Sequence, residues 1–169
     1  MRRFKVVLIG EGGVGKTTLI TKLLNNTFER KYIATLGVDV HPIVFNISDG
    51  TSIVLDIWDC AGQDKFGGLR DGYYINAKAC IVAYDRINEF TPTLVNKWIH
   101  AFRYVCNTGS IVLCKLKADI DVSMEEISNT SITCSTKSGY NIFELFSKVI
   151  KSLVGDEIEI VSINGITAF

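Results

Sequence analysis

Residues 10–17 have the composition and spacing of a loop that binds the phosphates of a nucleotide. Their sequence fits the pattern G-x-x-x-x-G-K-[ST], and they stand between an apolar run at 6–9 and a run with helical spacing at 18–24. A strand, a glycine-rich loop and a helix in this order are the context that the pattern requires. Glycines let backbone N–H groups face phosphate oxygens, and the helix N-terminus adds a favourable dipole. We expect Lys16 to reach the β- and γ-phosphates and Thr17 to ligate Mg²⁺. The other expected contacts of this loop are Gly12, Gly13, Val14, Gly15 and Thr18.

A second group of candidate residues follows the β-rich run that ends at Trp58. Asp59 at the carboxyl end of a strand, beside a phosphate loop, can hold Mg²⁺ directly or through its water. Gly62 leaves its backbone N–H free for a γ-phosphate, and Gln63 can orient an attacking water. Thr35, in an irregular segment, is the expected second hydroxyl ligand of the metal. Without the phosphate loop, Asp59 would be interpreted as a turn or capping residue and Thr35 as a solvated threonine.

The residues after two later strands predict a site for the base. Lys117 and Asp119 follow an apolar run at 111–114, and ligands of α/β sheets bind at such strand ends. Asp119 can accept hydrogen bonds from N1–H and the 2-amino group of guanine, a pair that adenine does not supply. The stem of Lys117 can cover the base, while Phe28 is either edge-on to the base or part of the core. A backbone N–H for guanine O6 is expected from Ser135, Thr136 or Lys137.

Composition excludes several classes of protein. The 169 residues fit a single domain, 1–169, and 47% of them are apolar, which is enough for a core. The formal net charge is zero, so no overall field favours nucleic acid or an anionic membrane as partner. The cysteines are odd in number and form no C-x-x-C pair, which favours reduced core thiols over disulfides or zinc. They are Cys60, Cys80, Cys106, Cys114 and Cys134.

No targeting signal is expected. No apolar stretch is long enough to span a bilayer, and the charged N-terminus enters a strand directly, unlike a signal peptide. Neither a myristoylation glycine nor a prenylatable cysteine is present at the ends of the sequence. We expect a soluble intracellular protein that acts as a monomer.

The hydrophobic pattern predicts alternating strands and helices. Strands are expected at 6–9, 38–47, 52–58, 79–84, 111–114 and 132–134, with a hairpin turn at 48–50. Helices are expected at 18–24, from Pro92 to about Val105, and at 141–153 before Gly155; residues 59–74 begin glycine-rich and then turn helical. This order predicts an α/β fold with a six-stranded mixed, mostly parallel sheet and helices on both faces.

Three segments resemble the Ran family of small GTPases, which act in nuclear transport. They are residues 10–18, 28–38 and 58–74, and the run K-F-G-G-L-R-D-G-Y-Y in the last is far more specific than general GTPase motifs. The resemblance extends from Phe4 to about Asp156. It implies the small-GTPase version of the P-loop NTPase fold, GTP/GDP and Mg²⁺ as cofactors, and Tyr32 as a further nucleotide contact. Switch I would cover 32–38 and switch II 62–74, both ordered by the γ-phosphate and released on hydrolysis.

The resemblance also implies partners. They are importin-β-like transport receptors, a GAP and an exchange factor, with a location in nucleus and cytoplasm. Receptors would dock on switch I, switch II and the pair Tyr73 and Tyr74.

The chain departs from that family at three places. Leu116 stands where the family motif N-K-x-D has asparagine, a residue that braces the phosphate loop and contacts the base, so weaker nucleotide binding is expected. The segment 120–134 is shorter than in the family and lacks its lysines and arginines. The sequence ends at Phe169 without the family's acidic tail, which would otherwise favour the GDP state. Binding to tail-embracing domains is therefore expected to be poor.

Two functions from different classes follow. The first is a Ran-like GTPase in which Gln63 and Lys16 are catalytic, with slow hydrolysis in the absence of a GAP. The alternative is a non-switching mimic, or decoy, that binds transport receptors without efficient GTP cycling; Leu116 and the short loop favour it, whereas Gln63 and Thr35 oppose it. An ATP-using kinase or motor domain is disfavoured because Asp119 has no role in binding adenine.

Overall fold

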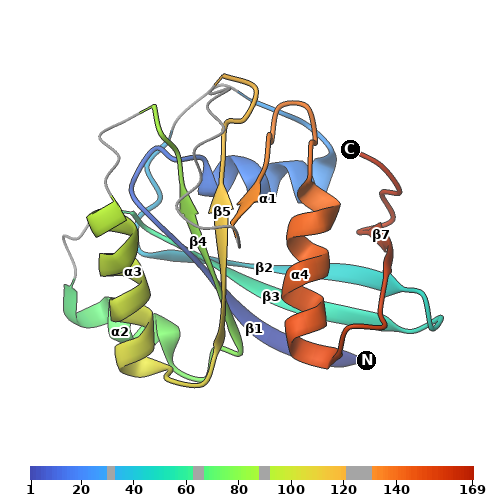
Figure 1. Ribbon diagram of the computed structural model, residues 1–169, viewed down its shortest axis with the longest axis horizontal. Coiled ribbons are helices and arrows are strands. Elements are labelled where there is room, and N and C mark those ends of the chain that lie inside the picture. The colour runs from blue at the N-terminus through green and yellow to red at the C-terminus, as the bar shows by residue number, and fades with distance from the viewer. Residues whose placement is uncertain (30–32, 63–66, 88–91, 121–130) are drawn as a thin grey trace.

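A seven-stranded sheet forms the centre of the described part of the chain, in which Figure 1 shows helices packed on both sides of the strands. The computed structural model describes residues 1–29, 33–62, 67–87, 92–120 and 131–169. The elements are β1 (Arg2–Ile9), α1 (Lys16–Asn25), β2 (Val38–Ile47), β3 (Ser52–Cys60), α2 (Gly67–Tyr74), β4 (Ala79–Tyr84), α3 (Pro92–Val105), β5 (Ser110–Lys115), β6 (Ile132–Thr133), α4 (Ile142–Val154) and β7 (Ile160–Ile163).

The strand order is β6-β5-β4-β1-β3-β2-β7. The central strand β1 pairs in parallel with both β3 and β4, so that Val6 lies opposite Ile57 on one side and Ala79 on the other. The hairpin of β2 and β3 is antiparallel, and Gly50 allows its turn with a φ of 81°. The phosphate loop and the loop after β5 consequently follow the carboxyl ends of parallel strands, and Asp59 lies at the carboxyl end of β3, at the same edge of the sheet.

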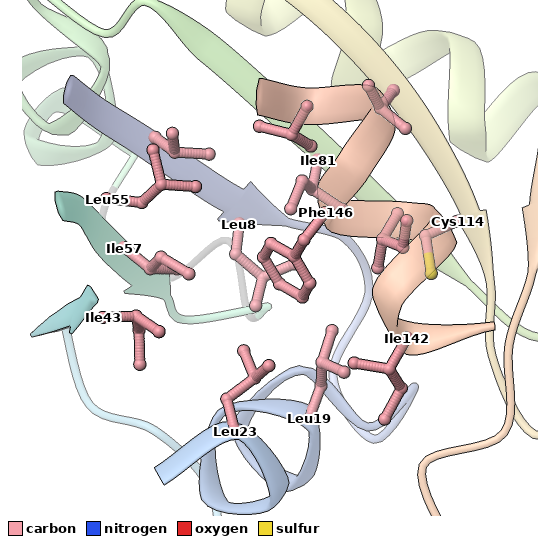
Figure 2. Close-up of a cluster of buried hydrophobic side chains, with 14 of the residues drawn as sticks. Leu8, Leu19, Leu23, Ile43, Leu55, Ile57, Ile81, Cys114, Ile142 and Phe146 are labelled. Atoms are coloured by element: carbon pink, nitrogen blue, oxygen red, sulfur yellow. The ribbon is translucent and has the colours of Figure 1, made fainter. Parts of the chain in front are cut away.

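Each face of the sheet has its own apolar layer. The helices α1 and α4 cover one face, where Leu19, Leu23, Ile142 and Phe146 pack on strand residues (Figure 2). The helices α2 and α3 cover the other, which includes Tyr74, Val95, Trp98 and Phe102. Because the second half of β1 (residues 6–9) and all of β4 are buried on both faces, these stretches are continuously apolar rather than alternating.

The predicted α/β fold is confirmed, but the predicted strand number is wrong. The seventh strand, β7, forms the edge of the sheet and pairs antiparallel with β2, with Phe45 opposite Ile163 and Asn46 opposite Ser162. Gly155 ends α4 as predicted. The strand after it has only four residues and no alternation of buried and exposed side chains, so its pairing was not predicted.

Tyr74 is fully buried against Phe102, with ring centroids 6.0 Å apart, so the prediction that it belongs to a docking surface is wrong. Its neighbour Tyr73 is half-buried.

Within the described ranges, no helix has the length and apolar character needed to cross a membrane.

Candidate functional site

A cavity of about 620 Å³ lies at the carboxyl ends of the parallel strands, where the start of α1 meets the loops after β3, β5 and β6. Phe28 lines the cavity and is half-buried. Of its two predicted positions, beside the base or in the core, the structure agrees with the one beside the base. The predicted residues that line the cavity are Gly12, Gly13, Val14, Gly15, Lys16, Thr17, Thr18, Phe28, Thr35, Gly62, Lys117, Asp119, Thr136 and Lys137.

The remaining predicted residues have different positions. Asp59 and Ser135 are buried directly behind the lining, and Tyr32 and Gln63 lie outside the described residues. Apart from Leu116, which the sequence singled out, the lining residues that were not predicted are Thr21, Glu29, Ile33, Ala34 and Ile120. Their residue types carry no chemical signal, and only their proximity in sequence to predicted residues could have indicated them.

The phosphate loop depends on close backbone contacts. Gly10, with a φ of 146°, approaches β4 so closely that a Cβ there would stand 2.0 Å from the carbonyl oxygen of Ala83. Gly15 has a φ of 107° at the N-cap of α1, and no side chain of the described residues caps that helix. The first N–H groups of α1 therefore face the cavity without a side-chain acceptor, which is the arrangement that binds phosphate.

Lys16 lies folded over this loop. Its ammonium donates hydrogen bonds to the carbonyl oxygens of Gly10, at 2.8 Å, and Glu11, at 2.9 Å, and the side chain is buried. Burial lowers the pKa of Lys16, an effect that the carboxylate of Asp59 partly opposes. A buried cation held by neutral carbonyls is placed to be stabilised by an anion in the cavity.

The loop is also tied to α3 by a contact that the sequence did not indicate. The indole N–H of Trp98 in α3 donates to Glu11 Oε1 at 2.8 Å. The cavity wall is thereby connected to the opposite helical layer.

Thr17, Thr35 and Asp59 converge as predicted for a metal site. The hydroxyl of Thr17 donates to Asp59 Oδ2 at 2.6 Å and lies 2.9 Å from that of Thr35. Asp59 is fully buried, and its Oδ1 accepts no hydrogen bond from the described residues. Burial raises the pKa of Asp59, while its bond from Thr17 and the Lys16 charge act in the opposite direction. Such an orphaned carboxylate oxygen beside two hydroxyls fits Mg²⁺, which takes oxygen ligands.

The base side of the cavity is built around Lys117 and Asp119. Lys117 has a φ of 63° and donates to the Gly13 carbonyl, at 2.8 Å, and to Asp85 Oδ2, at 2.5 Å, so it connects the phosphate loop to the end of β4. Ser135 Oγ donates to Asp119 Oδ1 at 2.7 Å, which orients a carboxylate that still has lone pairs for a ligand.

The Ser135 amide donates to the Tyr140 carbonyl at 3.1 Å. The Ser135 N–H is therefore already used within the loop. The candidates for the N–H that binds guanine O6 are then those of Thr136 and Lys137.

Leu116 replaces a polar brace with an apolar one. It is 1% exposed and belongs to the same buried cluster as Val14, and its Cδ1 lies 3.6 Å from where a Cβ on Gly15 would stand. An isobutyl group can support the phosphate loop by packing but can neither donate nor accept a hydrogen bond.

A phosphate loop, converging metal ligands and an aspartate at the base position occupy one cavity. A model of the Ras family matches residues 5–155. The chain belongs to the Ras family. Members of this family are GTP-binding switch proteins that hydrolyse GTP and use Mg²⁺, so the cavity is the candidate site for a guanine nucleotide.

Each group of residues then has a role in this Ras-family site. Thr17, Thr35 and Asp59 would hold the metal, which neutralises charge developing on the phosphates when bound. Lys16 and the loop amides would stabilise negative charge at the same place, and Asp119 would select guanine.

Proposed function

We propose that this Ras-family protein is a Ran-like GTPase that presents GTP-dependent switch segments to importin-β-like transport receptors in nucleus and cytoplasm. The observation that carries the proposal is the run at 58–74, which resembles the Ran family beyond the motifs shared by all small GTPases. An exchange factor and a GAP would regulate it.

Hydrolysis is slow in this proposal. Lys16 stabilises charge on the phosphates and Gln63 orients the attacking water. No arginine among the described residues lines the cavity, and the GAP would supply the arginine that completes the transition-state charge. Turnover without a GAP is then on the order of 10⁻⁴ to 10⁻³ per second, as for unassisted Ras.

A receptor surface beside the nucleotide supports the proposal. Ile33 and Leu36, on either side of the metal residue Thr35, are 67% and 84% exposed, and Val40 at the start of β2 is 46% exposed. Exposed apolar groups of this kind favour protein contacts. A partner that covers them senses the nucleotide because Thr35 lies 2.9 Å from Thr17 in the metal site.

The test is a pull-down of importin-β by the protein loaded with a non-hydrolysable GTP analogue or with GDP. We expect retention only in the GTP form and loss of retention on Leu36→Ser, with Tyr104→Ser as the control because Tyr104 is equally exposed, at 84%, on the distant helix α3. Equal retention in both nucleotide states, or none in either, rejects the proposal.

A second candidate is a decoy that holds receptors without cycling GTP. The apolar contact of Leu116 with the phosphate loop favours it, because the base loses a polar partner. Single-turnover hydrolysis separates the two functions: cleavage of bound GTP by the purified protein supports the switch, whereas receptor binding without cleavage, even with a GAP, supports the decoy.

A further inference from the structure

Residues 156–169, which follow the span matched by the Ras family model, form a strap across one end of the molecule. The strap is attached to β2 by strand pairing and by two bonds at Asn164, whose side chain accepts from the Val44 amide at 2.9 Å and whose amide donates to the Val44 carbonyl at 2.7 Å. Asn164 and Gly165, with φ of 47° and 80°, then reverse the chain in a two-residue turn. After this turn the strap runs towards the start of α4, as Figure 1 shows.

The strap ends against the loop that precedes α4. The ring centroids of Phe169 and Phe143 are 5.4 Å apart. The Lys22 ammonium of α1 lies 6.0 Å from the ring centroid of Phe169. Gly139 is in direct contact with Phe169, since a Cβ at position 139 would stand 2.4 Å from the Cβ of Phe169. Gly139 has a φ of 82°, so the loop passes beneath Phe169 in a conformation that glycine favours.

This loop, residues 135–141, orients the carboxylate of Asp119, the residue expected to bind guanine. The Gly139 amide donates to the Ser135 carbonyl at 2.9 Å, and the Ser138 amide donates to Ser135 Oγ at 3.2 Å. The same Ser135 hydroxyl donates to Asp119 Oδ1 at 2.7 Å. Phe169, Gly139, Ser135 and Asp119 therefore form a continuous series of contacts from the strap to the base site.

We propose that Phe169 is a positioning residue for guanine recognition, which acts through Gly139 and Ser135 on the Asp119 carboxylate. Through the contact of its Cβ and backbone with Gly139, Phe169 restricts the loop to the conformation in which Ser135 orients Asp119. The Phe169 ring packs on Phe143, so its loss releases the Cβ and backbone of residue 169 that contact Gly139. The loop can then move, and Asp119 spends less time aligned with N1–H and the 2-amino group. The inference rests on guanine-nucleotide binding and is independent of the transport function.

The test compares the dissociation rates of GDP and IDP, because IDP lacks the 2-amino group that Asp119 binds. In Phe169→Ala we expect GDP release to accelerate by about 10-fold, which is about 1.4 kcal/mol of binding, and IDP release to accelerate less, so that the preference for GDP falls. Faster hydrogen exchange at the Gly139 amide in the same variant would report the loosened loop directly. Val161→Ala is the matched control, because Val161 belongs to the same strap but is 57% exposed.

A purely structural role for Phe169 predicts a different result. General loosening would accelerate GDP and IDP release equally and leave their ratio unchanged, and that outcome, like unchanged release of both, overturns the proposal. Phe169→Leu, which keeps apolar contact with Phe143, is measured in parallel in case the alanine variant does not fold. It should show the same change in ratio to a smaller extent, and an unchanged ratio there also overturns the proposal.

Discussion

Leu116 packs against Gly15, with its Cδ1 3.6 Å from the position that a Cβ on Gly15 would take. The side chain that supports the phosphate loop from the base side is therefore apolar and buried. In the N-K-x-D motif of the resembled family this position is an asparagine, whose amide can bond both to the loop and to the base. We therefore expect Asp119 to select guanine but the phosphate loop to be supported less strongly than by an asparagine.

Leu116→Asn should consequently slow GDP release by roughly 10-fold or more, since one additional bond to buried polar partners contributes about 1–3 kcal/mol. Release of a fluorescent GDP analogue measures the effect. Leu113→Asn in β5, the strand that ends just before Leu116, is the control, because Leu113 packs in the other apolar layer and its substitution should leave the release rate unchanged. An unchanged rate in Leu116→Asn, or equal affinity of the parent for ATP and GDP, contradicts the prediction.

The Thr17 hydroxyl connects the other two metal residues, so Thr17→Asn should reduce the affinity for Mg²⁺·GTP far more than the stability of the fold. Thr17 is exposed, and its substitution leaves no cavity in the core. Titration of GTP at fixed Mg²⁺, beside thermal unfolding of the ligand-free protein, separates the two effects. Thr108→Asn should bind normally, because Thr108 is also exposed but does not line the cavity. A loss of stability that matches the loss of affinity would show that Thr17 has a structural role instead.

The sequence predicted the site more fully than the sheet. Lys16, Thr17 and Asp119 were predicted because a phosphate, a metal and a guanine each need one residue type at a fixed distance from a strand or helix end. β7 was not predicted, because a four-residue strand has little periodicity and its pairing with β2 depends on tertiary contacts. Tyr74 was assigned to a surface by resemblance, yet the packing of α2 on α3 buries it. The contact between Trp98 and Glu11 joins residues 87 positions apart, which no local pattern can indicate.

Gln63 is predicted to position the attacking water. Gln63→Leu should bind GTP as tightly as the parent and hydrolyse it more slowly, by a factor on the order of 10 or more, because leucine cannot orient a water molecule. Phosphate release in a single turnover, with and without a GAP, measures the effect. If the variant and the parent hydrolyse GTP equally in both conditions, the assignment of Gln63 is wrong.

Gly10→Ala should destabilise the protein severely. The new methyl group would overlap the backbone of β4, 2.0 Å from the Ala83 oxygen, and β1 cannot move away because it is buried on both faces. We expect a loss of about 3 kcal/mol or more in the free energy of unfolding, measured by urea denaturation. Gly50→Ala is the matched control: it also has a positive φ, of 81°, but nothing lies within 4 Å of its Cβ, so only about 1 kcal/mol of backbone strain is expected. Similar losses in the two variants would show that backbone conformation, and not the close approach, is what Gly10 supplies.

The thiol of Cys60 should be unreactive although it directly follows the metal residue Asp59. Burial, reinforced by the Asp59 charge, raises the pKa of Cys60 to about 12, and the side chain is 2% exposed. Because the thiolate is the reactive form, raising the pH from 8 to 10 should produce little alkylation of Cys60 in the folded protein.

An unfolded thiol ionises near pH 8.5. The raised pKa therefore makes the free energy of unfolding decrease as the pH rises above that value.

Iodoacetamide labelling followed by peptide mass analysis measures the reactivity, and it should label all five cysteines only after denaturation, since each is buried in the folded chain. Val161→Cys provides an exposed thiol for comparison, at a position in β7 that does not line the cavity. It should react at the rate of a free cysteine. Labelling of Cys60 at that same rate in the native protein would contradict both its burial and the raised pKa.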